Sequence, residues 1–424
     1  MKILIKDGTV INPGDKTEKN SDVLVESGKI VKIAPSISEK ADRTIDAKGC
    51  YVLPGFVDLH VHLRDPGLEY KETIETGGAA AIHGGFTTIV AMPNTKPVVD
   101  RADVVNYVKH KAESVTKAHV LQAGAVTKGQ AGKELADIRG MAAAGSPAIS
   151  EDGKSVMNAQ LYREGMKIAA EEGMVVLAHC EDIHMVNGGV LNADAKSQEL
   201  GLPGITNSVE DVIVARDILL AKETGVKLHL CHCSTKDSVR MVQLAKEEGI
   251  AVTAEVCPHH FSMSSEEIPG DDANYKMNPP LRTKEDVEAL KAGLAADIMD
   301  VIATDHAPHS AEEKQKSIQN APFGIVGLET AAALTYTNLV KPGILTMMQM
   351  AEKMSYNPAK VLGLDKGVVE EGACADLVVF DAGCTWEIDP AEFLSKGKNT
   401  PFAGQTVSGK VRATIVDGEI AYED

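Results

Sequence analysis

One segment decides the fold: Tyr51-Val52-Leu53-Pro54-Gly55-Phe56-Val57-Asp58-Leu59-His60-Val61-His62-Leu63-Arg64. It begins as an apolar run and ends with two histidines separated by one residue, which predicts a buried strand. Because side chains along a strand alternate between its two faces, His60 and His62 lie on the same face. Two imidazoles near the end of one strand can bind a single divalent cation. Two histidines alone would be weak evidence, but later segments supply matching partners.

The chain from about Pro54 to about Leu364 alternates short apolar runs with longer helical patterns. Strands that alternate with helices indicate a parallel sheet. Three further apolar runs end at polar residues, namely His179, His232 and Asp305. In a (β/α)8 barrel the carboxyl ends of all strands meet on one face, so these residues would surround one site. A doubly wound open sheet would place its strand ends in a row and explains this convergence less well.

The two ends of the chain have a different pattern. Residues 1–53 alternate short strand-like runs with turns, and the same pattern returns within residues 365–424. We therefore predict an α/β protein with a (β/α)8 TIM-like barrel over residues 54–364. Residues 1–53 and 365–424 together are predicted to form a small composite β-sandwich domain. The length of 424 residues fits, because such a barrel alone needs roughly 250 residues.

Composition narrows the functional class. The formal net charge is −18 and no basic patch is present, which argues against nucleic acid or an anionic membrane as a partner. No segment approaches the ~20 apolar residues of a membrane span, and the first residues carry no secretory signal. We expect a cytoplasmic protein that acts on a small molecule. Its seven cysteines, an odd number, predict no disulfide framework.

The polar strand ends supply more ligands than one metal ion needs. Five candidates exceed the four positions of a tetrahedral zinc, which implies two metal ions: His60, His62, His179, His232 and Asp305. A bridging anion should hold two such cations about 3.5–4 Å apart. The segment 147–153 runs as a short apolar strand into Glu151 and Asp152. Spacing alone does not choose between these two carboxylates.

Other residues close to these strand ends receive a structural interpretation. His229 has the opposite strand parity to His232, so we predict that it faces the barrel helices and binds nothing. Asp58 shares the parity of His60 and is expected to orient it by a hydrogen bond. Packing or helix capping is the alternative role for Asp58.

Residues 55–62 resemble the signature of the amidohydrolase superfamily, and the match to the long bacterial type of the dihydroorotase family is closer. The matching blocks occur in order at residues 62–67, 92–95, 178–182, 232–236, 275–282 and 303–309. Any one block is weakly diagnostic. All of them in order, at spacing similar to the family's, are very specific.

The resemblance implies a role for each candidate ligand. His60 and His62 would bind one zinc ion, and His179 and His232 would bind the other. Asp152 would bridge the two ions, and its short reach leaves the second site open to weak occupancy. Asp305 would bind the first ion and carry a proton. Dihydropyrimidinases and most allantoinases bridge their metals with a carbamylated lysine, whereas residues 148–153 contain no lysine.

The resemblance also implies the substrate contacts. Arg64 offers a planar fork suited to a carboxylate. The complete implied set is His62, Arg64, Asn94, Asn278, His309, and the backbone of Phe323 and Gly324. The charged stretch 310–316 is interpreted as part of a surface loop that closes over substrate.

The expected reaction is the reversible, zinc-dependent cyclisation of N-carbamoyl-L-aspartate to L-dihydroorotate plus water, in de novo pyrimidine biosynthesis. One alternative is another cyclic amidohydrolase, such as an allantoinase or a hydantoinase (dihydropyrimidinase). A second is a non-catalytic scaffold for aspartate carbamoyltransferase, although the chain keeps all six implied metal ligands. The resemblance further implies a homodimer and allows association with aspartate carbamoyltransferase.

Overall fold

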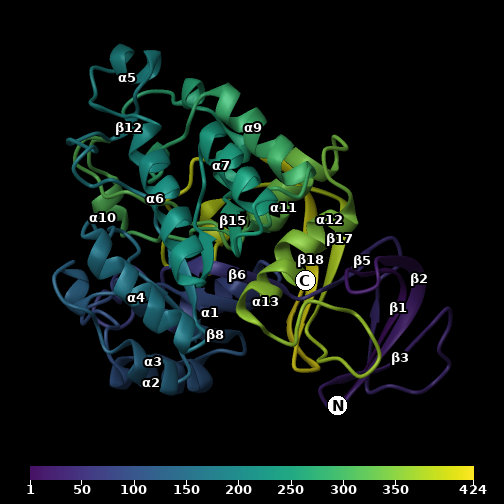
Figure 1. Cartoon of the computed structure of the whole chain (residues 1–424). Helices are drawn as coiled ribbons and strands as arrows, with labels where there is room; N and C mark the ends of the chain where they lie inside the picture. Colours follow the sequence, from purple (N-terminus) through teal and green to yellow (C-terminus); the bar gives the residue numbers. More distant parts are fainter.

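The computed structural model describes residues 1–424, which form a barrel and an adjoining sheet (Figure 1). The barrel strands are β6 (Phe56–Val61), β7 (Phe86–Ala91), β8 (His119–Gln122) continued by β9 (Gly124–Ala125), β10 (Ala148–Ser150), β11 (Val175–Ala178), β14 (Lys227–Leu230), β15 (Val252–Val256) and β16 (Val301–Ile302). All are parallel, in the order β6-β7-β8 and β9-β10-β11-β14-β15-β16. A parallel bridge from Val61 to His306 closes the ring. The predicted barrel is confirmed.

Helices follow the strands along the chain, and most of them cover the outside of the barrel (Figure 1). They are α1 (Ile74–His83), α2 (Ala102–Val115), α3 (Ile138–Ala143), α4 (Ala159–Glu171), α5 (Ala195–Glu199), α6 (Ser208–Thr224), α7 (Lys236–Glu247), α8 (Pro258–Ser262), α9 (Lys284–Ala295), α10 (Ala311–Lys314), α11 (Ala331–Thr335), α12 (Met347–Ala351) and α13 (Asn357–Leu362). A short parallel pair, β12 (Leu191–Asn192) and β13 (Gly204–Ile205), lies in the loop region after β11. No helix is both long and apolar enough to cross a membrane.

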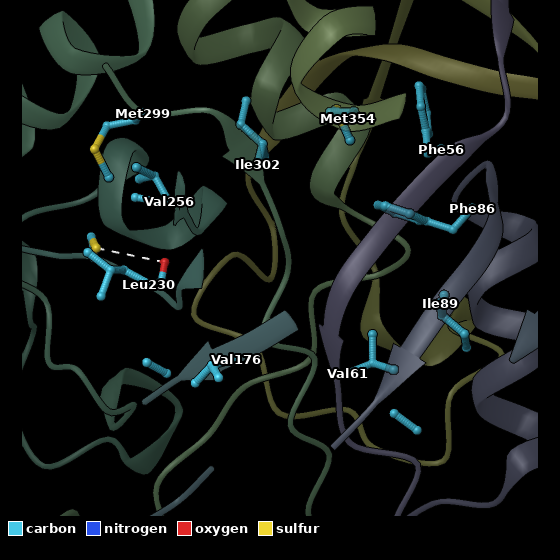
Figure 2. Close-up of a cluster of buried hydrophobic side chains, with 14 of the residues drawn as sticks. Phe56, Val61, Phe86, Ile89, Val176, Leu230, Val256, Met299, Ile302 and Met354 are labelled. Carbon is cyan, nitrogen blue, oxygen red and sulfur yellow. Dashed lines mark hydrogen bonds between the residues drawn. The ribbon is translucent and has the colours of Figure 1, made fainter. Parts of the chain in front are cut away.

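The buried side chains of the barrel strands form two layers. One set of side chains packs against the helices, and Figure 2 shows Phe56, Phe86 and Val61 among its members. The rings of Phe56 and Phe86 meet edge to face with centroids 5.6 Å apart, an arrangement worth about 0.5–1.5 kcal/mol beyond burial. Other strand residues, such as Leu59 and Leu177, fill the barrel interior. The barrel is therefore a packed core, and open space is left only near the strand ends.

Strands from both ends of the chain pair in one sheet, which confirms the prediction that the two ends fold together. Its strands are β1 (Lys2–Asn12), β2 (Thr17–Glu26), β3 (Lys29–Ala34), β4 (Arg43–Asp46), β5 (Tyr51–Pro54), β17 (Leu377–Glu387), β18 (Thr406–Val416) and β19 (Glu419–Glu423). The order is β19-β18-β17-β5-β1-β2-β3, with β4 also paired to β1. In Figure 1 the purple strands β1–β3 lie beside the yellow β17 and β18. The division after residues 53 and 364 stays a prediction.

Candidate functional site

Six polar residues gather where the barrel strands end. His60 is in β6 and His62 follows it; the others follow β10, β11, β14 and β16, namely Asp152, His179, His232 and Asp305. None is more than 7% exposed. His232 has φ +34° and Asp305 has φ +48°, left-handed conformations that are strained for residues other than glycine and recur at functional sites. The structure brings together the six residues that the sequence pattern and the family resemblance nominated.

Asp152 lies at the centre of this group. Its Oδ1 is 3.1 Å from Nε2 of His60, 3.4 Å from Nδ1 of His179 and 3.8 Å from Nε2 of His232. Its Oδ2 is 3.4 Å from Nε2 of His62. Burial opposes ionisation, but the surrounding imidazoles hold the pKa of Asp152 well below its usual range. One charged carboxylate therefore contacts four imidazoles.

Glu151, the alternative that spacing left open, points elsewhere. Its Oε2 accepts hydrogen bonds of 3.0 Å from the backbone N–H groups of Val126 and Thr127, and Oε1 accepts one from the Thr127 hydroxyl. These contacts fasten the loop after β9 to the end of β10. The geometry gives the central position to Asp152.

His60 and His62 each turn one ring nitrogen toward this centre. Nδ1 of His60 donates to Glu255 at 3.0 Å, and Nδ1 of His62 donates to Asn94 at 3.0 Å. When the rings are neutral, each Nε2 is an unprotonated nitrogen that faces Asp152, and Nε2 of His62 also lies 3.1 Å from Oδ1 of Asp305. Nε2 of His60 is fully buried and has no hydrogen-bond partner. A buried lone pair aimed at a carboxylate is what a divalent cation would satisfy.

The other two imidazoles complete the donor set. Nε2 of His179 donates to Glu181 at 3.2 Å, which leaves Nδ1 of His179 only 2.9 Å from Nε2 of His232. Donor atoms of His60, Asp152 and His232 lie within 4.8 Å of one another, as do those of His60, His62 and Asp305. The set consists of imidazole and ionised carboxylate groups, so it fits divalent metal ions.

Asp305 closes the group opposite Asp152. Its Oδ1 is 3.1 Å from Nε2 of His62 and 3.5 Å from Nε2 of His60. Burial opposes ionisation, but these imidazoles lower the pKa of Asp305 to about 2. The side chain is thus a carboxylate, able to accept a proton.

The sequence predicted that Asp58 orients His60 by a hydrogen bond. In the structure, Asp58 and Glu255 share this role. Asp58 accepts a 3.0 Å hydrogen bond from the backbone N–H of His60 and a 2.6 Å bond from the hydroxyl of Thr304, so it ties β6 to the end of β16. The ring of His60 is held by Glu255 of β15, a residue that the sequence analysis did not select. A buried acidic residue in the apolar strand Val252–Val256 was the available signal.

The predicted orientation of His229 was wrong. Its neighbours Leu228 and Leu230 pack against the helices, so His229 points into the barrel, where Nε2 donates to Glu255 at 2.9 Å. The parity argument failed because β14 ends at Leu230 and the left-handed backbone at His232 breaks the alternation. The side chains of His229 and His232 therefore both point into the barrel.

A cavity of about 180 Å³ opens onto the cluster. Its lining includes eleven of the twelve predicted site residues: His62, Arg64, Asn94, Asp152, His179, His232, Asn278, Asp305, His309, Phe323 and Gly324. The twelfth, His60, lies fully buried beneath. A larger cavity of about 560 Å³ lies between α2 and the terminal sheet, away from this cluster.

Arg64, Lys71 and His309, which we call the anion corner, meet beside the cavity. Nη2 of Arg64 is 3.4 Å and Nζ of Lys71 is 3.1 Å from the two ring nitrogens of His309. Nε2 of His309 also donates to the carbonyl of Phe323 at 2.7 Å. Burial first, and then the charges of Arg64 and Lys71, lower the pKa of His309 to about 2. Two cations and a neutral imidazole thus meet in a chain of net charge −18.

Of the two predicted asparagines, Asn94 holds a member of the cluster and Asn278 holds Glu181, the hydrogen-bond partner of His179. Nδ2 of Asn94 donates to Asp152 at 3.1 Å, and Nδ2 of Asn278 donates to Glu181 at 2.8 Å. Each amide also lines the cavity. Both are therefore placed between the candidate metal centre and the space for a ligand.

Comparisons with known proteins agree on one family. A family model described as "Dihydro-orotase-like" matches residues 49–238. The chain is 48% identical over 424 residues to a dihydroorotase of Pelotomaculum thermopropionicum, covering 100% of this chain and 99% of the relative. It is 46% identical over 426 residues to a dihydroorotase of Syntrophus aciditrophicus, covering 100% of both. The chain belongs to the dihydroorotase family.

A solved structure extends the likeness to the fold. The L-hydantoinase (dihydropyrimidinase) from Arthrobacter aurescens superposes with a TM-score of 0.87 at 29% identity, covering 99% of this chain and 96% of that one. The family and superfamily relationships expected from the sequence motifs are confirmed.

Proposed function

We propose that this chain is a dihydroorotase that catalyses the reversible cyclisation of N-carbamoyl-L-aspartate to L-dihydroorotate plus water, in de novo pyrimidine biosynthesis. Membership of the family supports the proposal. The observation that carries it is the anion corner, whose Arg64 and His309 line the same 180 Å³ cavity as the imidazole and carboxylate cluster. A small ring that carries a carboxylate fits this cavity, because its carboxylate can meet the anion corner while its amide faces the imidazole and carboxylate cluster.

The cluster is proposed to hold two zinc ions. His60, His62 and Asp305 would hold one, His179 and His232 the other, and Asp152 would be shared. Imidazole and carboxylate ligands suit zinc. When bound, such ions make water a nucleophile at neutral pH and stabilise negative charge on an amide oxygen.

Asp305 is proposed to move the proton. When the ring opens, its carboxylate accepts a proton from the attacking water and returns it to the ring nitrogen that leaves. When the ring closes, the same carboxylate takes the proton from the ureido nitrogen and delivers it to the departing oxygen. Its position 3.1 Å from His62 keeps it beside the reacting centre in both directions.

Arg64 is proposed to bind the substrate carboxylate with Asn94 and His309, and Asn278 to contact the polar edge of the ring. The backbone of Phe323 and Gly324 would line the remaining side. Gly324 has φ +130°, and a Cβ there would lie 2.7 Å from Cβ of Ala307 and 3.1 Å from Nε2 of His309. Any larger residue would therefore push into this wall.

Helix α10, within the stretch 310–316, is docked on the rim of the site. Glu313 pairs with Lys71 at 2.9 Å, and Nζ of Lys314 donates to the carbonyls of Pro322 and Gly324 at 3.1 and 2.8 Å. This segment is proposed to exclude water from the bound substrate, as closing loops do.

We further propose that the protein is a cytoplasmic homodimer that associates with aspartate carbamoyltransferase. Its barrel is proposed to span residues 54–364, and its composite domain residues 1–53 and 365–424. The resemblance seen in the sequence motifs suggests the two associations, and the single sheet built from both chain ends supports the division into domains. Light scattering of the purified chain, alone and mixed with the transcarbamoylase, measures both associations.

Substrate choice tests the function. We expect zinc-supplemented protein to open L-dihydroorotate, followed by the loss of its ultraviolet absorbance, and to close N-carbamoyl-L-aspartate in the reverse direction. Turnover of only uncharged rings, such as dihydrouracil or hydantoin, would instead favour the hydantoinase function that the structural likeness suggests. Inactivity on every ring, with metal bound, would favour a scaffold.

A further inference from the structure

Glu255 is a fully buried carboxylate that accepts hydrogen bonds at both oxygens. Oε1 accepts one bond of 3.0 Å from Nδ1 of His60 and another of 3.1 Å from the backbone N–H of His232. Oε2 accepts a bond of 2.9 Å from Nε2 of His229. Nδ1 of His229 lies 2.8 Å from the hydroxyl of Thr253, which anchors this chain of contacts on β15.

A single oxygen therefore joins residues that belong to different metal positions in the proposed function. Its bond to His60 requires the proton on Nδ1, which leaves Nε2 free to face Asp152. Its bond to His232 acts on the backbone, where φ is +34°. A left-handed conformation in a residue with a side chain costs about 1–3 kcal/mol and persists only where neighbours hold it. The carboxylate of Glu255 supplies one of those contacts.

We propose that Glu255, held in turn by His229, is a positioning residue that couples the two metal positions. This inference rests on the proposed metal centre and adds a property to it. Removing the carboxylate releases the ring of His60 and the backbone of His232 together, so both ions bind more weakly and their occupancies fall in parallel. Hydrogen-bond partners of metal ligands typically contribute 10–100-fold to metal affinity.

Two substitutions of Glu255 differ in the hydrogen bonds that they keep. Leucine in Glu255→Leu has similar bulk and accepts no hydrogen bond, so both contacts are lost. Glutamine in Glu255→Gln can keep its carbonyl oxygen toward His60 and His232, while its amide group faces His229. His229 can then carry its proton on Nδ1, toward the hydroxyl of Thr253, and accept from the amide at Nε2. Glu255→Gln should therefore rescue most of the affinity that Glu255→Leu loses.

The matched control is Glu210→Gln. Glu210 is also a buried carboxylate, 2% exposed, but its hydrogen bonds go to the backbone N–H of Ser234 and to the hydroxyls of Ser234 and Ser238. It contacts no imidazole of the cluster. The control removes a buried negative charge and leaves the proposed coupling intact.

The experiment is a competition titration of the full metal-free chain with zinc against a fluorescent chelator, repeated with cobalt(II) to follow the absorption spectrum of each site. Wild-type protein should bind two equivalents; if it binds none, the proposed metal centre itself fails. We expect Glu255→Leu to weaken both equivalents 10–100-fold and to change both cobalt spectra, while Glu255→Gln stays within tenfold and Glu210→Gln within twofold of wild type.

Two results would overturn the coupling. One is an affinity within twofold of wild type for both ions in Glu255→Leu. The other is loss at one position while the second keeps its affinity and spectrum. If Glu255→Leu does not fold, His229→Gln provides the test, because it removes the partner of Oε2; there we expect a parallel, several-fold weakening, and unequal weakening would refute the proposal.

Discussion

Replacement of Arg64 by methionine tests the anion corner most directly. Methionine keeps much of the length and apolar contact of the side chain but removes the guanidinium. In the structure Arg64 is only 9% exposed and its Nε donates to the carbonyl of Pro308 at 3.2 Å. This contact fixes the fork beside His309 before any ligand arrives. The substrate carboxylate would therefore lose a charged partner that was already oriented.

The size of the effect follows from the geometry. Truncating one partner of a buried, hydrogen-bonded charge pair costs about 2–5 kcal/mol. At 1.36 kcal/mol per tenfold, kcat/KM for L-dihydroorotate should fall roughly 30- to 5000-fold. Dihydrouracil has the same kind of ring without the carboxylate, so its kcat/KM should change little. The ratio of the two values isolates the contribution of the carboxylate from any general damage.

The assay measures kcat/KM for both rings with wild type, Arg64→Met and a control, Arg163→Met. Arg163 pairs with Glu223 at 2.9 Å on the outside of the barrel, so its loss should leave the ratio unchanged. Metal content and thermal unfolding of each variant are measured alongside. If Arg64→Met keeps its metal and the ratio changes by less than threefold, Arg64 does not bind the substrate carboxylate and the reasoning is wrong.

Further predictions concern the metal ions, the anion corner and the buried carboxylate of Asp376. Asp152→Asn should remove at least one metal equivalent and lower kcat by more than 100-fold, measured with metal analysis; retention of both metals would contradict the shared role. Prolonged dialysis against a chelator should abolish ring opening, and added zinc should restore it; activity that survives complete metal removal would contradict the mechanism. Lys71→Met should raise KM for L-dihydroorotate about tenfold with a smaller change in kcat, whereas an unchanged KM would separate Lys71 from the anion corner. Burial opposes ionisation of Asp376, but His119 and Lys366 lower its pKa to about 2, so its carboxylate stabilises the fold above pH ~4 and that contribution disappears as pH falls toward 2. Urea unfolding should show Asp376→Asn about 2 kcal/mol less stable at pH 7, with the difference shrinking below pH 4; a constant difference would refute this assignment.

The sequence predicted the parts of the fold that depend on residue pattern. Apolar runs ending at His179, His232 and Asp305 indicated a barrel because only closure brings all strand ends to one place. The same logic located His60 and His62. It could not choose between Glu151 and Asp152, since consecutive residues differ in direction only after the backbone beyond β10 is known. The structure settles their placement, because Glu151 accepts backbone hydrogen bonds from the preceding strand region.

The errors arose where the backbone leaves regular geometry. His229 was assigned to the helical side by extending strand alternation through residue 232, but β14 ends two residues earlier. A left-handed conformation at a histidine has no reliable signature in residue type, since the strain is held by neighbours distant in sequence. Here one neighbour is Glu255, 23 residues away. The contact that supports the backbone of His232 also explains why an acidic residue lies within an otherwise buried strand. The negative charge of Glu255 is matched by donors that only the folded barrel brings together. Local pattern therefore identifies the residues that could bind metal, whereas long-range hydrogen bonds determine which of their atoms face it.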